Sequence, residues 1–339
     1  MPDFRAAILS AVAEADRLHN QFDVRSRIDR GNGRIDVFNM LVSRDIPIVF
    51  KPLKGLLGAF LNEDGATGVM VSTKRPLPVQ RFTAAHEFGH AVLGHETSLD
   101  DEAMLARMPF SDQTTRSDVR EVQANAFASE LLMPKWLLAN HMIRQGWKPA
   151  DLATPATVYQ LSLRLGTSYA AACNTLLYRN VISRQAYDQL SFVTPKVIKQ
   201  SLAAPHQPES WHGDVWVVTE RDDGLLLEGS RTDLVVFRLA EHSGSGYMWR
   251  FEELAEVGLL SVHNVRTSDR DADVIGGVVS RTVIAAVQDD AKGELHLKEV
   301  RPWQVGGEPL HSLNLLVDLS GPLKDGLLPA QREAYLGAA

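Results

Sequence analysis

The stretch RFTAAHEFGHAVLGHE, Arg81–Glu96, decides how this chain folds and works, because it sets two histidines four residues apart in a helical pattern. Residues four apart project from the same face of an α-helix, one turn from each other. His86 and His90 can therefore share one tetrahedral Zn²⁺. Glu87 follows the first histidine and can exchange a proton with a water at the metal. The H-E-x-x-H spacing predicts metal-assisted hydrolysis.

Zinc needs a third protein ligand, and the sequence offers three candidates. His95 lies shortly after the motif, but its spacing is one residue short of the metzincin arrangement. The segment VREVQANAFASELLMP, residues 119–134, is strongly helical and carries Glu121 and Glu130. We expect an acid from this second helix, with Glu121 ahead of Glu130, and His95 stays open as an alternative.

Composition limits the function classes. The chain has 339 residues, 45% hydrophobic and 23% charged, which is typical of soluble globular proteins and long enough for two or three domains. A net charge of −7 argues against a general binder of nucleic acids or membrane surfaces, which would need clustered Lys and Arg. The single cysteine, Cys173, predicts a reducing compartment. With no secretory signal and no membrane-spanning run, we expect a cytoplasmic protein.

Four segments are expected along the chain. Helical periodicity over residues 4–20, a strand at 46–50, a hairpin across LGAFLNEDGATGVMVS and the two helices above indicate an α+β domain over residues 1–140. A helical segment over 141–205 follows. Short alternating runs such as VWVV, LVVFRL and LNLLVDL predict an all-β sandwich over 206–321, and a tail occupies 322–339.

The helical segment contains TVYQLSLRLGTSYAAACNTLLYRN, which resembles a helix-turn-helix with Ser168 capping the second helix. Its AAACNT face lacks side chains that read base edges, so a packing or substrate-docking role is favoured over DNA binding. Cys173 lies in this helix and supports a sharper hypothesis. Its thiolate could occupy the open zinc position and hold an enzyme latent, but a small residue packed in the helix is the favoured interpretation.

The β-rich half carries three ordered signals. SGSGYMWRF places a glycine-rich loop before a run in which Tyr247 and Trp249 alternate. VIGGVVSR sets Gly276–Gly277 at a turn, and RPWQ sets Trp303 in a loop after a strand. Three loops at one end of a sandwich form an interaction scaffold.

The two N-terminal motifs together resemble the ImmA/IrrE family of zinc peptidases, and the resemblance covers residues 1 to about 190. It implies a gluzincin-like zincin fold in which His86, His90 and Glu121 bind zinc and Glu87 is the general base. His95 also recurs in the family pattern, as a scaffold hydrogen-bonding or outer-shell residue. The family implies cleavage of a partner helix-turn-helix repressor, which derepresses stress-response, mobile-element or phage-defence genes.

The C-terminal signals resemble the chagasin-type inhibitors of papain-like cysteine peptidases, which show N-P-T-T-G-Y-x-W, then G-G, then R-P-W-E. Here the first loop is HSGSGY and Gln304 replaces the acid. These departures loosen the shape of an inhibitory loop, so an immunoglobulin-like recognition or regulatory domain is favoured. Tyr247, Trp249 and Trp303 are the candidate partner-binding residues, with core packing as the alternative for Tyr247 and Trp249.

Three functions follow from the sequence. The first is a cytoplasmic zinc endopeptidase that acts on a repressor. The second is an inhibitor or protein-binding module that works through the C-terminal loops. The third is a DNA-binding regulator that uses the helical segment.

Overall fold

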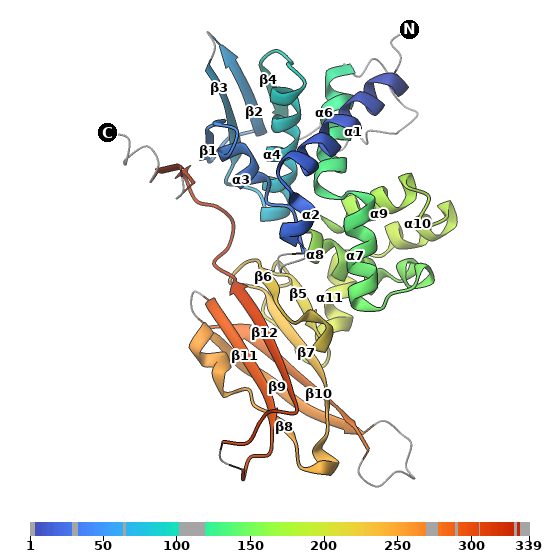
Figure 1. Cartoon of the computed structure of the whole chain (residues 1–339), viewed down its shortest axis with the longest axis vertical. Coiled ribbons are helices and arrows are strands. Elements are labelled where there is room, and N and C mark those ends of the chain that lie inside the picture. The colour runs from blue at the N-terminus through green and yellow to red at the C-terminus, as the bar shows by residue number, and fades with distance from the viewer. Residues whose placement is uncertain are drawn as a thin grey trace. The chain divides into compact units, whose positions relative to one another are not determined.

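The computed structural model describes residues 4–28, 33–63, 66–101, 119–268, 277–288, 291–304, 306–328 and 331–332. The chain divides into two compact units. Unit 1 contains Met1–Asn140, Leu161–Arg184 and Pro322–Ala339, and unit 2 contains His141–Gln160 and Gln185–Gly321. Figure 1 shows the elements of both units.

Unit 1 contains a five-stranded sheet of order β13-β1-β3-β2-β4. Its strands are β1 (Ile48–Lys51), β2 (Leu56–Glu63), β3 (Ala66–Ser72), β4 (Ser98–Asp101) and β13 (Gly326–Leu327). β1 runs parallel to β3, whereas β2 pairs antiparallel with β3 and β4. The hairpin expected from the sequence is confirmed by the β2–β3 register, and its Asp-Gly turn lies outside the described residues.

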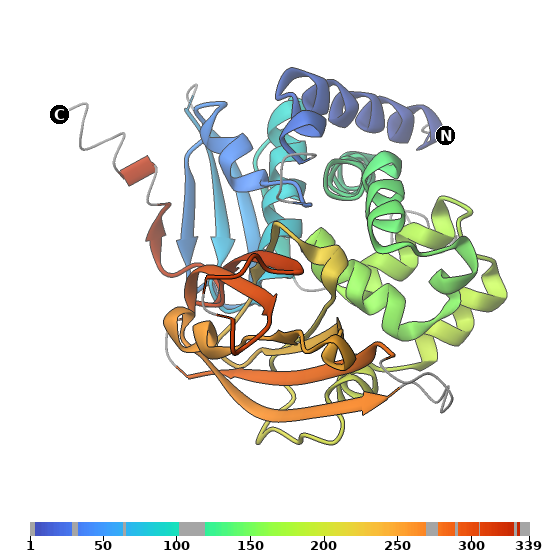
Figure 2. The same cartoon turned by 60° about the horizontal axis from the view of Figure 1, so that its bottom comes forward.

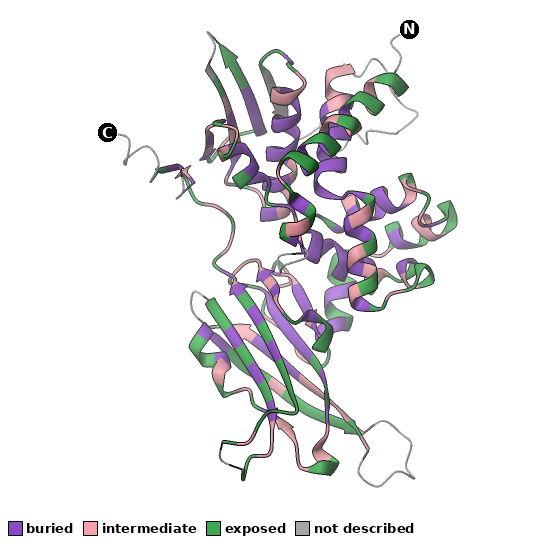
Figure 3. Ribbon diagram, in the orientation of Figure 1, coloured by how far each residue is buried: buried purple, intermediate pink, exposed green. Residues whose placement is uncertain are grey.

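Three helices build the rest of the core of unit 1: α1 (Phe4–Gln21), α4 (Leu77–Val92) and α6 (Val119–Leu132). α4 packs on β2 and β3 and on α6, and α6 also packs on α1. The close approach of α4 and α6 depends on Gly89, because a Cβ there would stand 3.2 Å from the Cα of Ala124. Most of α4 is therefore buried, as Figure 3 shows.

α4 begins slightly earlier than the sequence indicates. The sequence pattern predicts a start just after Pro78, whereas the helix starts at Leu77 with Pro76 as its N-cap. Proline is tolerated in the first turn because the amide that it lacks would have no intrahelical partner there. The boundary moves by one turn or less, and the histidine motif stays inside the helix.

The remaining helices are α2 (Val24–Arg27), α3 (Val37–Val42), α7 (Lys135–Gln145), α8 (Pro155–Leu165), α9 (Tyr169–Tyr178), α10 (Arg184–Phe192) and α11 (Pro195–Ala203). α8 and α9 are joined by a turn in which Gly166 has a φ of +67°, a value that favours glycine. The Ser168 hydroxyl accepts a hydrogen bond from the amide of Ala171 at 3.2 Å. The expected cap is therefore in place.

The segment expected as a tail returns to the sheet of unit 1. β13 pairs antiparallel with β1, and Val49 is opposite Leu327. Gln331 continues this contact through its side chain, whose Nε2 donates to the carbonyl of Ile46 at 3.3 Å and whose Oε1 accepts from the amide of Ile48 at 3.4 Å. The outer edge of β1 is thus covered by a short strand and one amide side chain.

Unit 2 contains two four-stranded sheets, β5-β7-β10-β9 and β6-β12-β11-β8, which are the gold to red strands in Figure 2. Alternating burial, as in Leu295 and Leu297 of β11, turns one face of each sheet inward. The strand bounds are β5 (Val215–Val218), β6 (Leu225–Glu228), β7 (Leu234–Glu241), β8 (Met248–Trp249), β9 (Leu259–Ser268), β10 (Val279–Val287), β11 (Lys292–Val300) and β12 (His311–Asp318).

Among the helices that the structure describes, none combines the length and the apolar content that crossing a bilayer requires.

Candidate metal centre

His86 and His90 of α4 meet Glu121 of α6 in the interior of unit 1. Their Nε2 atoms lie 3.1 Å apart, and carboxylate oxygens of Glu121 lie 3.3 Å from His86 Nε2 and 3.5 Å from His90 Nε2. Zinc binds imidazole nitrogens and carboxylate oxygens at about 2.0–2.2 Å, which sets neighbouring ligand atoms a little over 3 Å apart. The spacing and chemistry of this donor set therefore fit a Zn²⁺ ion.

The other ring nitrogens of both histidines face hydrogen-bond acceptors. His86 Nδ1 lies 3.0 Å from Oδ1 of Asn125, and His90 Nδ1 lies 2.9 Å from Nδ1 of His95. His95 Nε2 in turn lies 3.3 Å from Oε1 of Gln123. A consistent set of tautomers has protons on both Nδ1 atoms, so each Nε2 lone pair points into the metal centre. Outer partners of this kind orient the ligands of zinc sites.

The protonation state of Glu121 also favours the binding of a cation. Burial acts to raise the pKa of Glu121, but hydrogen bonds and charge interactions with His86 and His90 outweigh it and lower that pKa well below its usual range. The pKa of His95 is lowered, first by burial and then by its neighbour His90. Glu121 is therefore a carboxylate, and His95 is neutral, at physiological pH.

Glu87 lies on the same helix turn as His86, with no solvent-exposed surface. It stands against β2 at Gly58, where an added Cβ would come within 2.7 Å of Glu87 Oε1 and 2.9 Å of the Met70 carbonyl oxygen. Only a residue without a side chain leaves room for the carboxylate at this position. Gly58 of β2 therefore leaves the space that the buried Glu87 carboxylate occupies.

Two other predicted residues lie apart from this cluster. Glu130, the second candidate for the third ligand, forms a 2.7 Å ion pair with Arg179. Cys173 is buried in α9, and burial raises the pKa of its thiol to about 11. Among the described residues, the group of close metal-binding atoms in unit 1 contains His86, His90 and Glu121 alone. The zinc-latch hypothesis for Cys173 finds no support in this arrangement.

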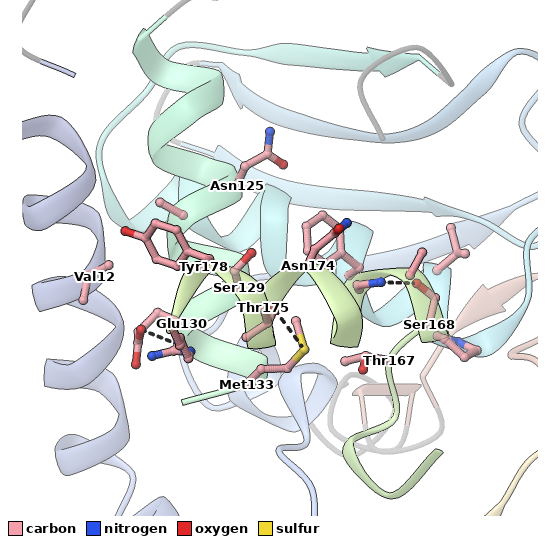
Figure 4. A pocket seen from close by; sticks show the side chains of 17 residues that line it. Val12, Asn125, Ser129, Glu130, Met133, Thr167, Ser168, Asn174, Thr175 and Tyr178 are labelled. Carbon is pink, nitrogen blue, oxygen red and sulfur yellow. Dashed lines mark hydrogen bonds and ion pairs between the residues drawn. The ribbon is translucent and has the colours of Figure 1, made fainter. Parts of the chain in front are cut away.

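A mainly apolar cavity of about 190 Å³ lies between α1, α4, α6 and α9. Figure 4 shows Val12 and Glu130 toward one end and Thr167 and Ser168 toward the other. Asn125 lines this cavity and also accepts the hydrogen bond from His86. A side chain or ligand in the cavity would thus touch the residue that orients a metal ligand.

The helical segment presents few accessible arginine side chains for binding DNA phosphates. Arg164 is buried, and Arg179 is occupied by Glu130 in a largely buried ion pair. Of Arg164, Arg179 and Arg184, the arginines near the recognition helix, only Arg184 is exposed. Phosphate binding needs several accessible cations, so the DNA-binding hypothesis finds no support here.

The three aromatic residues predicted at the C-terminal loops differ in exposure. Trp303 is 69% exposed, whereas Trp249 is 3% exposed and donates its indole N–H to the carbonyl of Ala240 at 2.8 Å. Trp249 is therefore a core residue and does not present a binding surface. Tyr247 is half-buried beneath the guanidinium of Arg301, at 4.5 Å. The Gly-Gly turn lies partly outside the described residues, because Gly276 is not among them.

Sequence reasoning missed the hydrogen-bond acceptors Asn125 and Gln123 and the small residue Gly58. Asn125 lies one turn after Glu121 on α6, so its spacing from a predicted ligand is the one signal that could have found it. Gln123 and Gly58 carry no such signal, because their partners are far away in the sequence.

Residues 43–177 match the family model of the IrrE N-terminal-like domain, Peptidase_M78. The β-rich part is 26% identical over 108 residues to Amoebiasin-2 of Entamoeba histolytica, across 32% of this chain and 88% of that protein. A crystal structure of the cysteine protease inhibitor EhICP2, also from Entamoeba histolytica, is 23% identical and covers 32% of this chain and 99% of that chain, with a TM-score of 0.30. A Mycobacterium tuberculosis transcriptional regulator is 10% identical across 82% of this chain and 76% of that one, also with a TM-score of 0.30.

Neither TM-score is high enough to establish a shared fold. The family match is the finding that bears on the metal centre, since α4, α6 and every residue of the cluster lie inside it. Residues 43–177 are thus similar to the IrrE N-terminal-like peptidase domain, and they are followed by a β-rich part that is similar to Amoebiasin-2.

Proposed function

We propose that this chain is a cytoplasmic zinc endopeptidase whose site is formed by His86, His90, Glu121 and Glu87. The observation that carries the proposal is the convergence of both Nε2 atoms on the Glu121 carboxylate, with the two Nδ1 atoms directed at Asn125 and His95. Such an arrangement is typical of ligands held ready for a metal.

Each residue has a defined task in this proposal. A bound Zn²⁺ would supply Lewis-acid polarisation of the scissile carbonyl. Glu87 takes a proton from the attacking water and returns it to the leaving amine, the usual role of a general base and acid. Its buried position against Gly58 fixes where that proton is held. Asn125 and the His95–Gln123 pair keep the two imidazoles in one orientation.

The substrate that we propose is a helix-turn-helix repressor, whose cleavage derepresses stress-response, mobile-element or phage-defence genes. The support is the two-motif resemblance to the ImmA/IrrE family together with the family match over residues 43–177. The test incubates the zinc-loaded chain with a purified repressor encoded beside it, and follows the fragments by mass spectrometry. We expect one or a few cuts in the repressor.

Glu87→Gln keeps the shape of the side chain but cannot accept the proton. We expect it to retain zinc and to lose cleavage by about 10²–10⁴-fold. The matched control is Glu96→Gln, since Glu96 is exposed and pairs only with Arg120 in the described structure. Full activity in Glu87→Gln would overturn the mechanism, and an uncut repressor with the wild-type chain would overturn the substrate assignment.

A second candidate function is inhibition of a papain-like cysteine peptidase by the β-rich unit. It is favoured by the 26% identity to Amoebiasin-2 and by the exposed Trp303. The full chain carrying Glu87→Gln, which should not cut the target itself, is titrated against a papain-like enzyme. Stoichiometric inhibition that Trp303→Ala weakens would support this function, and unchanged enzyme activity at a large excess would exclude it.

A further inference from the structure

A second group of metal-binding side chains lies in unit 2, more than a hundred residues after the first. His242 follows β7, Glu299 lies near the end of β11, and His311 begins β12. One donor atom from each of the three residues lies within 4.8 Å of the others. Neither the predicted peptidase site nor the family match over residues 43–177 includes them.

The Glu299 carboxylate contacts both rings, and His242 Nδ1 is shared between its two oxygens, at 3.1 Å from Oε1 and 3.2 Å from Oε2. Oε1 accepts a hydrogen bond from the backbone amide of His242 at 2.6 Å, which fixes the carboxylate in place. Oε2 faces both rings, at 2.7 Å from His311 Nδ1 and 3.2 Å from His242 Nδ1. The 3.2 Å separation is close to the 3.3 and 3.5 Å between Glu121 and its two histidines, whereas the 2.7 Å contact is a hydrogen-bond distance. Oε2 and two Nδ1 atoms thus form a converging set of three donors.

Burial and charge distinguish this group from an ordinary ion pair. The Glu299 side chain has no exposed surface, and a buried carboxylate is costly unless a cation compensates it. The neighbouring buried acid Glu241 has two arginine partners, Arg266 at 2.7 Å and Arg281 at 3.5 Å. Glu299 instead faces two imidazoles, which are metal ligands when neutral.

Access to solvent is also suitable for a metal that enters after folding. The side chains of His242 and His311 are 31% and 49% exposed, so the donors open outward over the buried Glu299. The rings lie 5.2 Å apart between centroids and are tilted by 33°. Two histidines and one carboxylate with an open side match the donor sets that bind Zn²⁺ and similar divalent ions.

The group stands where two loops of unit 2 begin. His242 precedes the loop over residues 243–247, and Glu299 precedes the loop that carries Arg301 and Trp303. These loops touch each other: Arg301 Nε donates to the carbonyl of Ser245 at 3.2 Å, and Gly246 leaves no room for a Cβ beneath the Trp303 indole. A metal held at the base would therefore tie the two loops together.

We propose that His242, Glu299 and His311 form a second divalent-cation site, best suited to Zn²⁺, that fixes the two loops carrying Tyr247 and Trp303. The site is independent of the peptidase function, because its residues belong to unit 2 alone. Its role is structural: it sets how the exposed Trp303 is presented to a partner. Metal binding at this site changes no covalent bond in the Glu299 carboxylate or in the two imidazole rings.

The test measures the zinc content of the full chain without a histidine tag, by mass spectrometry of the metal after loading and dialysis. We expect two equivalents per wild-type chain and one in His311→Gln, which replaces a half-exposed side chain and should not disturb the core. His242→Gln is the second variant with the same expectation. The matched control, His296→Gln, changes an exposed histidine on β11 and should keep two equivalents.

The same measurement separates this proposal from the peptidase. His86→Ala should lose one equivalent and keep the other, and the double variant His86→Ala/His311→Gln should bind none. The second site is overturned if the His311→Gln variant and the His242→Gln variant each bind as much zinc as the wild type. This holds whether or not the site in unit 1 binds zinc. If the His86→Ala variant keeps all of its zinc and the His311→Gln variant loses it, the second site is supported. The same result would show that the first site does not bind the metal.

A second readout follows the loops themselves. Trp303 is 69% exposed, so its fluorescence should shift or become less accessible to a soluble quencher when zinc is added to the His86→Ala variant. The shift should be lost in His86→Ala/His311→Gln. An identical response in both variants would show that the ion does not act at the loop base.

Discussion

Gly58 and Glu87 share a space that only one side chain can occupy: a Cβ on Gly58 would stand 2.7 Å from Oε1 of Glu87. Gly58→Ala should therefore displace the carboxylate and overpack the contact with β3, at a cost of about 1–3 kcal/mol of stability. We expect peptide cleavage to fall while zinc binding persists. Gly68→Ala on β3 is the control, because its Cβ would meet nothing closer than 3.8 Å. Equal activities in the two variants would contradict the packing argument.

Two alanine variants distinguish Glu121 from Glu130 as the third zinc ligand, because one should lose zinc and the other should lose stability. In the His311→Gln background, where only the site in unit 1 should bind metal, Glu121→Ala should abolish the remaining equivalent of zinc. Glu130→Ala should keep the metal but leave Arg179 without its buried partner, which costs roughly 3 kcal/mol. Metal analysis and urea unfolding measure the two effects. Zinc retained by Glu121→Ala would return the choice to Glu130 or His95.

Asn125 should act on metal affinity through His86. Asn125→Ala removes the acceptor for His86 Nδ1–H, and losses of this kind lower metal affinity by about 10–100-fold. Asn125→Asp keeps an acceptor and should restore binding. Competition with a zinc chelator measures both, and Ser129→Ala, on the same helix and the same cavity, is the control. A similar loss in Ser129→Ala would indicate general damage to α6.

Cys173 should be inert at neutral pH. Burial raises the pKa of its thiol from 9.0 to about 11, so at pH 8 the reactive thiolate is about 100-fold scarcer than in an exposed cysteine. Labelling with a thiol reagent should accelerate only on unfolding. The raised pKa also predicts stability that is present below pH 9 and is lost as pH rises toward 11, because the unfolded chain releases the proton first. Cys173→Ala should remove this loss and leave basal proteolysis unchanged; a rise in proteolysis would revive the latch.

Trp249 and Trp303 of unit 2 should behave oppositely when each is replaced by alanine. Trp249→Ala empties a buried site and should destabilise the unit by about 3–5 kcal/mol. Trp303→Ala should leave the unfolding midpoint nearly unchanged but weaken partner binding by about 30-fold, the size of an interface hot spot. Phe192→Ala, an exposed aromatic residue on α10, is the control for surface effects. Partner binding that survives Trp303→Ala would place the interface elsewhere.

The sequence predicts what depends on local spacing. The four-residue separation of His86 and His90, the hairpin of β2 and β3 and the Ser168 cap follow from helix periodicity and turn chemistry. It does not predict contacts between distant segments. The alternation of Tyr247 and Trp249 cannot reveal that β8 has only two residues and turns Trp249 inward, because that depends on the pairing with β11.

The metal ligands illustrate the same limit. Glu121 could be favoured over Glu130 only by its place in a helix and by resemblance, since both acids lie on one strongly helical segment. Helix packing decides, because α4 meets α6 at Gly89 and brings the first acid to the histidines. His242 and Glu299 are 57 residues apart and share no motif, so their contact cannot be predicted from local spacing.

The covered edge of β1 has a consequence for handling this protein. A strand edge with free amides and carbonyls can recruit other chains and start aggregation. Here β13 and the side chain of Gln331 occupy that edge after the chain has passed through the whole β-sandwich. Any version of the protein cut before residue 326 would expose it, and loss of solubility would then be mistaken for loss of a regulatory domain.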